Sequence, residues 1–293
     1  MMKKIATSIM AMILAGVSIF GVSGCLSTFD FKNEFIWEGD FAYHEMSEGN
    51  YSVLDLTEQG KQKSVLYIPA YFRDGIVTYT REEHFGEVDD VGYSLNVGRK
   101  EKVYFPFGHR GYSASNIMHF CYGNMDLEFY ANSSEYYLDY ILNHARPWGV
   151  GQLIKKYYIS SGLFNILTQK LSAYQAEYPL ITFSMENSYT VVAQEKETKS
   201  LIHAANTSYM FNYEGEPNEG YFFINDFERG GLIEDTPYEP RREGYTFAGW
   251  YKEPECVNAW DFTKDTLPAA EYDEEGNLLF VETKLYAKWN IAV

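Results

Sequence analysis

The stretch that decides the fold is PRREGYTFAGWYKEPECVNAWDF, residues 240–262, together with TKLYAKW, residues 283–289. Around Tyr245 the side chains alternate between the two sides of a predicted strand. One side carries Tyr245, Phe247 and Tyr251. The other side carries Thr246, Ala248 and Trp250. Leu285, Ala287 and Trp289 form a second apolar row of the same period, so the C-terminal part of the chain is predicted to be β-structure rich in aromatic residues.

The N-terminus has the anatomy of a secretion leader. Lys3 and Lys4 precede an apolar run that extends from residue 5 to about residue 20. The run ends at Val22-Ser23-Gly24-Cys25, which resembles a lipobox, where a cysteine thiol accepts a diacylglyceryl group before the leader is removed. We predict a lipoprotein signal peptide over residues 1–24, lipidation of Cys25, and a lipid anchor on the extracellular face of the cell membrane. An uncleaved membrane helix is the alternative, because about 20 apolar residues span a bilayer.

The charge of the chain excludes one class of partner. The sequence holds 24 Lys and Arg residues against 41 Asp and Glu residues, a formal net charge of −17. The predicted leader has two lysines and no acidic residue, so its removal changes this charge to −19. Such a surface repels phosphate backbones, and we therefore expect no nucleic acid partner. Without a polybasic patch, membrane attachment is expected to depend on the lipid.

The composition predicts a mainly β fold with a few helices, of the α+β class. Aromatic residues make up 17% of the chain, which favours strands and large buried cores. Residues 25–50 are interpreted as a tether with at most an edge strand, FDFKNEFIW (29–37). Short β-type runs are predicted at 51–56, 64–68, 76–80 and, as two strands around a turn, within 180–194. Helices are predicted from Ser133 or Ser134 to about residue 144 and from about residue 163 to residue 178, ending before Pro179. Residues 58–61 are expected to form a turn and residues 195–200 a solvated link.

Two proline-terminated β-runs indicate a repeat in the first half. Ile68-Pro69 and Phe105-Pro106 each close such a run, 37 residues apart. These segments resemble the BspA-like leucine-rich repeats, on VLYIPAYFRDGIVTY (65–79) and NIMHFCYGNMDLEFYANSS (116–134). Cys121, Asn124 and Leu127 lie near the Cys-Asn-Leu positions of that family, and KYYISSGLFNIL (156–167) resembles the segment that closes such arrays. The resemblance implies a degenerate leucine-rich-type β domain over residues 51–200, with two or three distorted coils.

Residues 206–290 resemble the internalin-type B repeat, a small β-grasp-like module of bacterial surface proteins. GYTFAGWY and LYAKW carry the resemblance, with WDF between them. Its signature residues are Gly244, Tyr245, Phe247, Gly249, Trp250, Tyr251, Leu285, Tyr286 and Trp289. The insertion PAAEYDEEGNLLFVE, residues 268–282, departs from the family pattern and is expected to lengthen a loop or hairpin. The resemblance implies a spacer or adhesion unit.

Candidate chemistry is sparse, and we predict no catalytic residues, no metal site and no cofactor. The six histidines lack metal-binding spacing; His109 and His119 could meet on adjacent coils but are better explained as ordinary surface or core histidines. Arg110 could hold a carboxylate or sulfate, although a plain loop explains it better. The acidic run at 271–277 resembles a calcium loop but lacks a glutamate at the twelfth position, which favours a solvated hairpin. Cys121 and Cys256 are expected to remain thiols.

These observations predict a non-catalytic cell-surface lipoprotein with an adhesion, ligand-binding or structural role at the envelope. Its expected partners are the membrane, through the lipid, and an unknown protein or glycan ligand. One alternative is a glycan-binding accessory protein for nutrient capture, which a concave aromatic strip would favour. The other is a hydrolase with an unrecognised cleft, which a deep pocket with paired carboxylates would favour.

Overall fold

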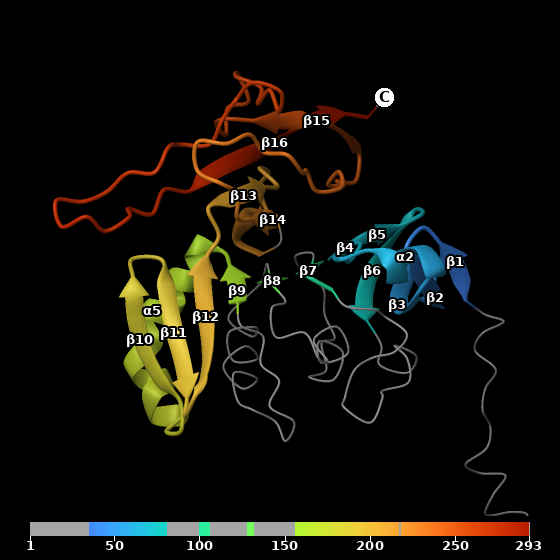
Figure 1. Ribbon diagram of the computed structural model, residues 1–293. Coiled ribbons are helices and arrows are strands. Elements are labelled where there is room, and N and C mark those ends of the chain that lie inside the picture. The colour runs from blue at the N-terminus through green and yellow to red at the C-terminus, as the bar shows by residue number, and fades with distance from the viewer. Residues whose placement is uncertain (1–34, 81–99, 106–127, 132–155, 217, 293) are drawn as a thin grey trace, which may run out of the picture. The chain divides into compact units, whose positions relative to one another are not determined.

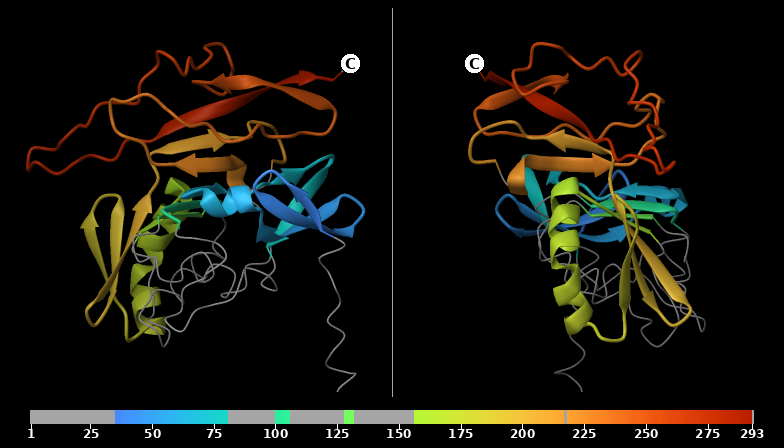
Figure 2. Two further views of the ribbon diagram at one scale, coloured as in Figure 1. Left: turned by 45° about the vertical axis from the view of Figure 1, so that its right-hand side comes forward. Right: turned by 90° about the vertical axis from the view of Figure 1, so that its left-hand side faces the viewer.

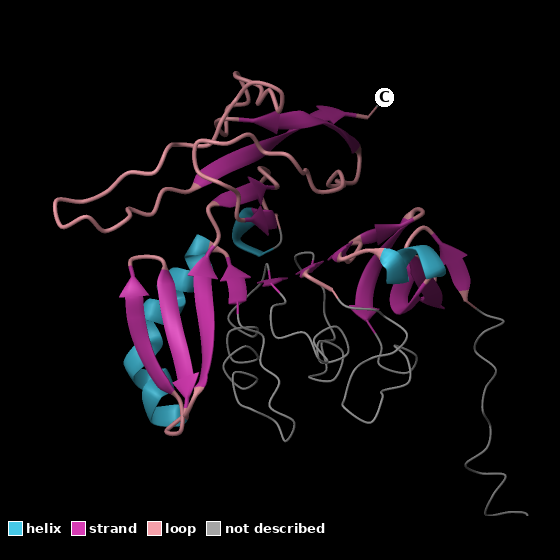
Figure 3. Cartoon of the chain, viewed as in Figure 1, coloured by secondary structure: helices cyan, strands magenta, loops and turns pink. Residues whose placement is uncertain are grey.

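The computed structural model describes residues 35–80, 100–105, 128–131, 156–216 and 218–292. Apart from the first residue of the first strand, the described helices and strands lie within one compact unit, Trp37–Val293. Most of the described regular structure is strand, with few helices, which confirms the predicted mainly β class (Figures 1 and 3). Within the described residues, no helix is both long and apolar enough to cross a membrane. The helix predicted at residues 133–144 lies outside the described residues.

The first sheet has the strand order β1-β2-β3-β6-β5. Its strands are β1 (Ile36–Glu38), β2 (Phe41–Ser47), β3 (Asn50–Leu56), β5 (Tyr71–Phe72) and β6 (Gly75–Thr80). Strands β3 and β6 confirm two of the predicted β-runs. The tether prediction is wrong from residue 41 onward, because β2 pairs along its length with β3. The predicted turn at 58–61 is instead a short helix, α2 (Glu58–Gln62), since the Thr57 side chain accepts a hydrogen bond from the Gly60 amide and caps it.

The second sheet has seven strands in the order β10-β11-β12-β9-β8-β7-β4. The strands are β4 (Val65–Tyr67), β7 (Lys102–Phe105), β8 (Glu128–Ala131), β9 (Lys156–Ile159), β10 (Thr182–Asn187), β11 (Thr190–Glu195) and β12 (Thr198–Ala204). Strands β4, β7, β8, β9 and β12 are parallel and in register. One face of these strands is buried and includes Leu66, Val103, Tyr157 and Ile202. The opposite face carries the tyrosines and charged residues described below.

Helix α5 (Ser161–Glu177) confirms the predicted second helix. It begins where the Ser160 side chain accepts a hydrogen bond from the Leu163 amide, and it ends before Pro179. Its apolar side, including Leu163 and Leu167, is buried, and both views in Figure 2 show it beside strands β10–β12. Strands β10 and β11 confirm the predicted hairpin. The predicted solvated link at 195–200 is wrong, because Lys196 and Glu197 form a tight turn, with Lys196 at φ 54°, that leads directly into β12.

The third sheet has the order β14-β13-β16-β15. Its strands are β13 (Thr207–Met210), β14 (Tyr221–Asn225), β15 (Tyr245–Tyr251) and β16 (Thr283–Ile291). Strand β16 lies between β13, which is parallel to it, and β15, which is antiparallel. Its predicted apolar row is confirmed at Leu285 and Ala287, both fully buried.

A β-bulge interrupts strand β15 and corrects the predicted alternation. Phe247 pairs with Trp289, but Trp250 pairs with Ala287, so the register shifts between Phe247 and Trp250. Gly249 has φ 105°, a conformation that suits glycine and makes room for the extra residue. Phe247 and Trp250 therefore share one face, with ring centroids 5.1 Å apart. Strict alternation placed them on opposite faces, and that prediction is wrong.

Candidate ligand-binding site

A ladder of stacked tyrosines follows the parallel strands of the second sheet. Tyr67, Tyr104, Tyr130 and Tyr158 occupy the same register position in β4, β7, β8 and β9. Successive ring centroids are 4.5, 4.2 and 4.4 Å apart, and all three pairs are stacked. His203 of β12 continues the ladder at 5.1 Å from Tyr158. The parallel register thus produces a continuous aromatic face, because equivalent side chains in neighbouring strands lie side by side.

His203 is held as a neutral core residue. Burial lowers its pKa to about 4, so the imidazole is uncharged at pH 7. Its Nδ1 is 2.9 Å from the Thr190 hydroxyl, which satisfies that ring nitrogen. The ladder therefore ends in an aromatic ring that carries no charge at neutral pH.

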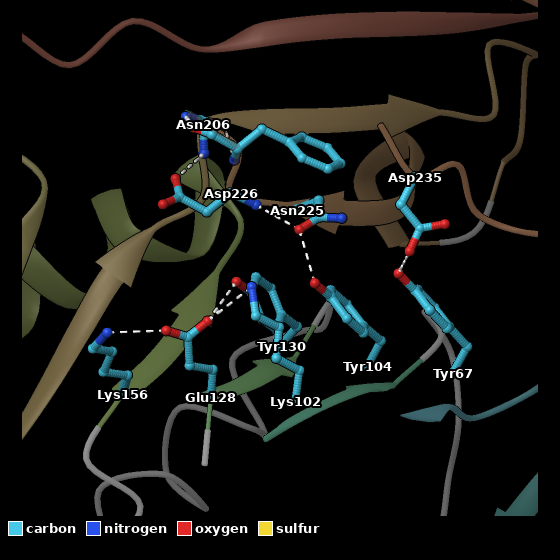
Figure 4. Close-up of polar contacts among 11 residues, drawn as sticks. Tyr67, Lys102, Tyr104, Glu128, Tyr130, Lys156, Asn206, Asn225, Asp226 and Asp235 are labelled. Atoms are coloured by element: carbon cyan, nitrogen blue, oxygen red, sulfur yellow. Dashed lines mark hydrogen bonds and ion pairs between the residues drawn. The ribbon is translucent and has the colours of Figure 1, made fainter. Parts of the chain in front are cut away.

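A row of charges lies two residues before the tyrosines on the same face. Glu128 of β8 stands between Lys102 of β7 and Lys156 of β9 (Figure 4). Its carboxylate is 2.9 Å from the Lys156 amine and 3.2 Å from the Lys102 amine. The Tyr130 hydroxyl donates a third contact at 3.1 Å. Burial opposes ionisation of Glu128, but the two lysines outweigh it and hold its pKa below its usual range.

The third sheet docks on this ladder through polar contacts. The Tyr104 hydroxyl donates to Asn225 Oδ1 at 3.0 Å, and the Tyr67 hydroxyl donates to Asp235 (Figure 4). Asn225 is the last residue of β14, and its side chain contacts the parallel sheet through this hydrogen bond. The same segment is fixed by Asn206, whose side chain donates to the Phe227 carbonyl at 2.7 Å.

One buried cluster joins the parallel sheet to the third sheet. It contains Tyr104, Tyr130 and Tyr158 from the ladder, and Tyr209, Phe223 and Trp250 from the third sheet. The Tyr104 and Phe223 rings are 5.4 Å apart. The two predicted domains, 51–200 and 206–290, therefore share a core across their boundary, which alternation within single strands could not reveal.

Beside this junction is a pocket of about 460 Å³. Its floor is formed by Lys102, Glu128, Tyr130 and Tyr158 of the sheet. Residues 226–229, which follow β14, form a second wall. The third wall comes from Ala270, Tyr272 and Leu278, all within the insertion at 268–282. Three segments that are far apart in the sequence thus line one open pocket.

Two groups of opposite charge border the second wall. Burial raises the pKa of Asp226 to about 6, although its Oδ1 accepts a hydrogen bond from the Asn206 amide at 3.2 Å. The Arg229 guanidinium lies 5.2 Å from the centre of the Tyr189 ring. Its Nε is buried and has no hydrogen-bond partner among the described residues. An acidic and a basic side chain therefore line the same side of the pocket.

The structure places the predicted site residues as follows. Trp250 and Leu285 are buried, and the Trp289 indole donates to the Phe211 carbonyl at 2.6 Å. Tyr245, Phe247, Tyr251 and Tyr286 lie in the paired strands β15 and β16, and Gly244, at φ 74°, precedes β15. Cys256 is a thiol without a disulfide. The remaining candidates lie outside the described residues: Cys25, His109, Arg110, His119, Cys121, Asn124 and Leu127.

The acidic run at 271–277 forms a hairpin within the insertion. Asp273 accepts hydrogen bonds from the Asn277 amide at 2.7 Å and from the Asn277 side chain at 2.9 Å. Tyr272 and Leu278 face each other in a β-bridge. In the described part of the chain, no group of three or more His, Cys, Asp or Glu residues is placed to hold a metal ion. The local contacts agree with the hairpin interpretation of this run.

Sequence reasoning missed the tyrosine ladder and the pocket. A signal for the ladder is present, since VLY, KVY, EFY and KYY place tyrosine at the same position of four β-segments. The pocket has no comparable signal. Asp226, Arg229 and Tyr272 share no motif, and only the packing of three segments brings them together.

Comparison with known proteins finds similarity for one part of the chain. Residues 209–273 match the Listeria-Bacteroides repeat domain family. Two proteins of Evansella cellulosilytica are each 37% identical over 68 residues, 23% of this chain. One is provisionally named a Gly-rich membrane protein and the other a membrane protein, and the match covers 6% and 8% of their respective lengths. The chain thus spans less than a tenth of these relatives, and it contains a repeat of a surface-protein type, within the span predicted to be a B repeat.

Proposed function

We propose that this chain is a non-catalytic protein of the bacterial cell surface, anchored through a lipid on Cys25, that binds a protein or glycan at the envelope. The match of residues 209–273 to the Listeria-Bacteroides repeat domain carries the proposal. The membrane-protein names of the two relatives agree with it. In this proposal the repeat is part of the binding structure, because it shares a buried cluster with the parallel sheet.

The parallel sheet supports a leucine-rich-type origin for the first domain. Strands β4, β7, β8 and β9 repeat one register, and their core-facing residues alternate with the tyrosine face. The intervals between β7, β8 and β9 fall within the roughly 20–29 residues usual for leucine-rich repeats. The longer interval between β4 and β7 corresponds to an insertion.

The contacts of Glu128 support a non-catalytic role. A glycosidase needs one carboxyl as an acid and a second as a nucleophile or base. Glu128 and Asp226 line the same pocket, and their pKa values are moved in opposite directions. However, both oxygens of Glu128 are already engaged, one by Lys156 and the other by Lys102 and Tyr130. Such a carboxylate is a poor base because its lone pairs already accept hydrogen bonds.

The lipid anchor is tested by labelling cells with a clickable palmitate analogue. Cys25→Ala is expected to abolish labelling and to leave the leader attached. Cys256→Ala is the matched control, because this thiol lies in the C-terminal domain far from the lipobox in sequence, and full labelling is expected. Undiminished labelling of Cys25→Ala would refute the anchor.

Binding is tested with the purified full chain as bait for envelope glycans and surface proteins. An unrelated protein of similar negative charge is the control bait. We expect the chain to retain ligands that the control bait does not retain. This retention should be insensitive to salt, because the negative charge of the chain disfavours binding to anionic polymers. Equal retention on both baits would contradict the proposal. Turnover of a glycan or peptide library that Asp226→Asn abolishes would show an enzyme instead.

A further inference from the structure

We infer that the pocket between the parallel sheet and the insertion at 268–282 is a binding site for a neutral sugar ring, the terminal unit of a glycan. This inference rests on the proposed ligand-binding function and assigns that function a site and a ligand class. It depends on three features: an exposed aromatic ring, a donor and an acceptor side chain on one wall, and a nearly balanced charge.

The insertion forms a defined wall. Its hairpin is closed by hydrogen bonds from the Leu279 amide to the Glu271 carbonyl at 2.8 Å and from the Asp273 amide to the Asn277 carbonyl at 2.9 Å. Phe280 stacks on Tyr189 at 5.9 Å, which fixes the hairpin against the β10–β11 connection.

Tyr272 supplies the aromatic surface. It lines the pocket, yet it is 62% exposed. A large aromatic side chain on a fixed hairpin gains little by remaining in water, because burial of such rings is strongly favourable. The apolar C–H face of a pyranose would cover the ring and recover part of that free energy.

Polar groups suited to hydroxyls border the same space. Arg229 lines the pocket, and its guanidinium N–H groups are donors suited to a hydroxyl oxygen. Asp226, close in sequence on the same wall, can accept from a hydroxyl when ionised and donate when protonated. A sugar hydroxyl both donates and accepts, so one ligand satisfies both residues.

The charges disfavour an ionic ligand. Lys102 and Arg229 face Glu128, Asp226 and Glu228 around the pocket, and Lys102 is already paired with Glu128. The carboxylates would repel an anionic ligand, and the two basic side chains would repel a cationic ligand. A neutral polyhydroxyl compound avoids both costs. The volume of about 460 Å³ also lies in the range of roughly 300–1,000 Å³ that is usual for small-ligand sites.

The test is saturation-transfer NMR and calorimetry on the full chain. The probes are glucose, galactose, mannose, N-acetylglucosamine and maltose, with glucuronic acid and glucose 6-phosphate as charged counterparts. We expect at least one neutral sugar to bind. The matching charged sugar should bind at least tenfold more weakly, and affinity should change less than about twofold when ionic strength is raised to about 1 M. Equal or tighter binding of the charged sugars, or no binding of any neutral sugar, would overturn the inference.

Variants locate the site. Tyr272→Ala and Arg229→Gln are each expected to weaken binding by about tenfold or more, and Tyr272→Phe should retain it, because stacking needs only the ring. Leu279→Ala is the matched control, since this residue lies in the same hairpin, is 40% exposed and does not line the pocket. Unfolding midpoints verify that each variant folds. Binding that survives Tyr272→Ala in a folded protein would place the sugar elsewhere and refute the assignment.

The two proposals fail separately. If the chain retains envelope ligands but binds no sugar in the pocket, the sugar site is wrong and the surface-binding function stands. If the chain retains nothing selectively and binds no sugar, the proposed function fails as well. Free sugars and glycan-coated beads, compared in parallel, distinguish a single-ring ligand from a polymer end.

Discussion

Lys100 is a buried lysine whose replacement gives the sharpest test of how the first two sheets are joined. Its side chain is fully buried. The amine donates to three backbone carbonyls at the end of helix α2: Gly60 at 3.0 Å, Lys61 at 2.9 Å and Lys63 at 2.6 Å. Burial lowers its pKa to about 8, so the amine is still mostly protonated at pH 7. It therefore acts as a charged cap on the carbonyl end of the helix.

Lys100→Met removes this cap while retaining a long apolar stem. Hydrogen bonds to charged groups contribute about 1.5–3 kcal/mol each, and they are not additive. Water can reach some of the three carbonyls, and the variant no longer buries a charge, so we expect a loss of about 3–5 kcal/mol in the free energy of unfolding. The measurement is urea unfolding of the full chain at pH 7.

Lys63→Met is the matched control for this substitution. Its amine makes an ion pair with Asp40, and its side chain is 47% exposed. An exposed pair contributes about 0–1 kcal/mol, so this variant should unfold almost as the parent does. A loss below about 1 kcal/mol for Lys100→Met, or equal losses for both variants, would refute the assignment of Lys100 as a structural cap.

Three further predictions concern Asp226, Tyr130 and Gly249. Burial raises the pKa of Asp226 to about 6 in the folded chain, above the usual aspartate pKa of about 3.9, so the unfolded chain loses this proton first and stability falls as pH rises from about 4 to 6. Between pH 4 and pH 7, the free energy of unfolding of Asp226→Asn should fall by about 1–3 kcal/mol less than that of the parent chain. An equal fall in both proteins, measured by urea unfolding at the two pH values, would contradict this. Burial raises the pKa of Tyr130 above its usual range, so its contribution is complete below pH 10 and is lost as pH rises further. Tyr130→Phe should therefore show a shallower alkaline loss of stability, at a cost of about 0.5–1.5 kcal/mol at pH 7 for the lost hydroxyl contact, and an unchanged alkaline profile would count against it. Gly249→Ala forces a side chain to φ 105° and should cost about 1–3 kcal/mol in urea unfolding, whereas an unchanged midpoint would argue against the bulge.

Local pattern was enough to predict elements whose burial follows one period. The row of Leu285 and Ala287 is buried as its alternation indicates. Helix α5 begins next to a serine cap and ends before Pro179, and both signals are local in sequence. The β10–β11 hairpin follows from two β-type runs around a turn. In each case the deciding interactions lie within a few residues, so the sequence contains them directly.

Local pattern failed where a distant strand or one unusual residue decided the outcome. Residues 41–47 form β2 because β3 offers a partner edge. Phe247 and Trp250 share a face because Gly249 accommodates a bulge. Neither effect changes the composition of its segment, and so neither is visible in hydrophobic periodicity.

Composition and local periodicity were sufficient to predict an acidic, aromatic-rich, mainly β chain with paired strands in its C-terminal part. Long-range packing brings tyrosines from four strands into one stacked ladder and places the third sheet against it. The candidate pocket likewise exists only after three segments meet. The physical reason is that periodicity specifies which side of a strand is apolar, whereas register and docking depend on the shape of surfaces that are remote in sequence.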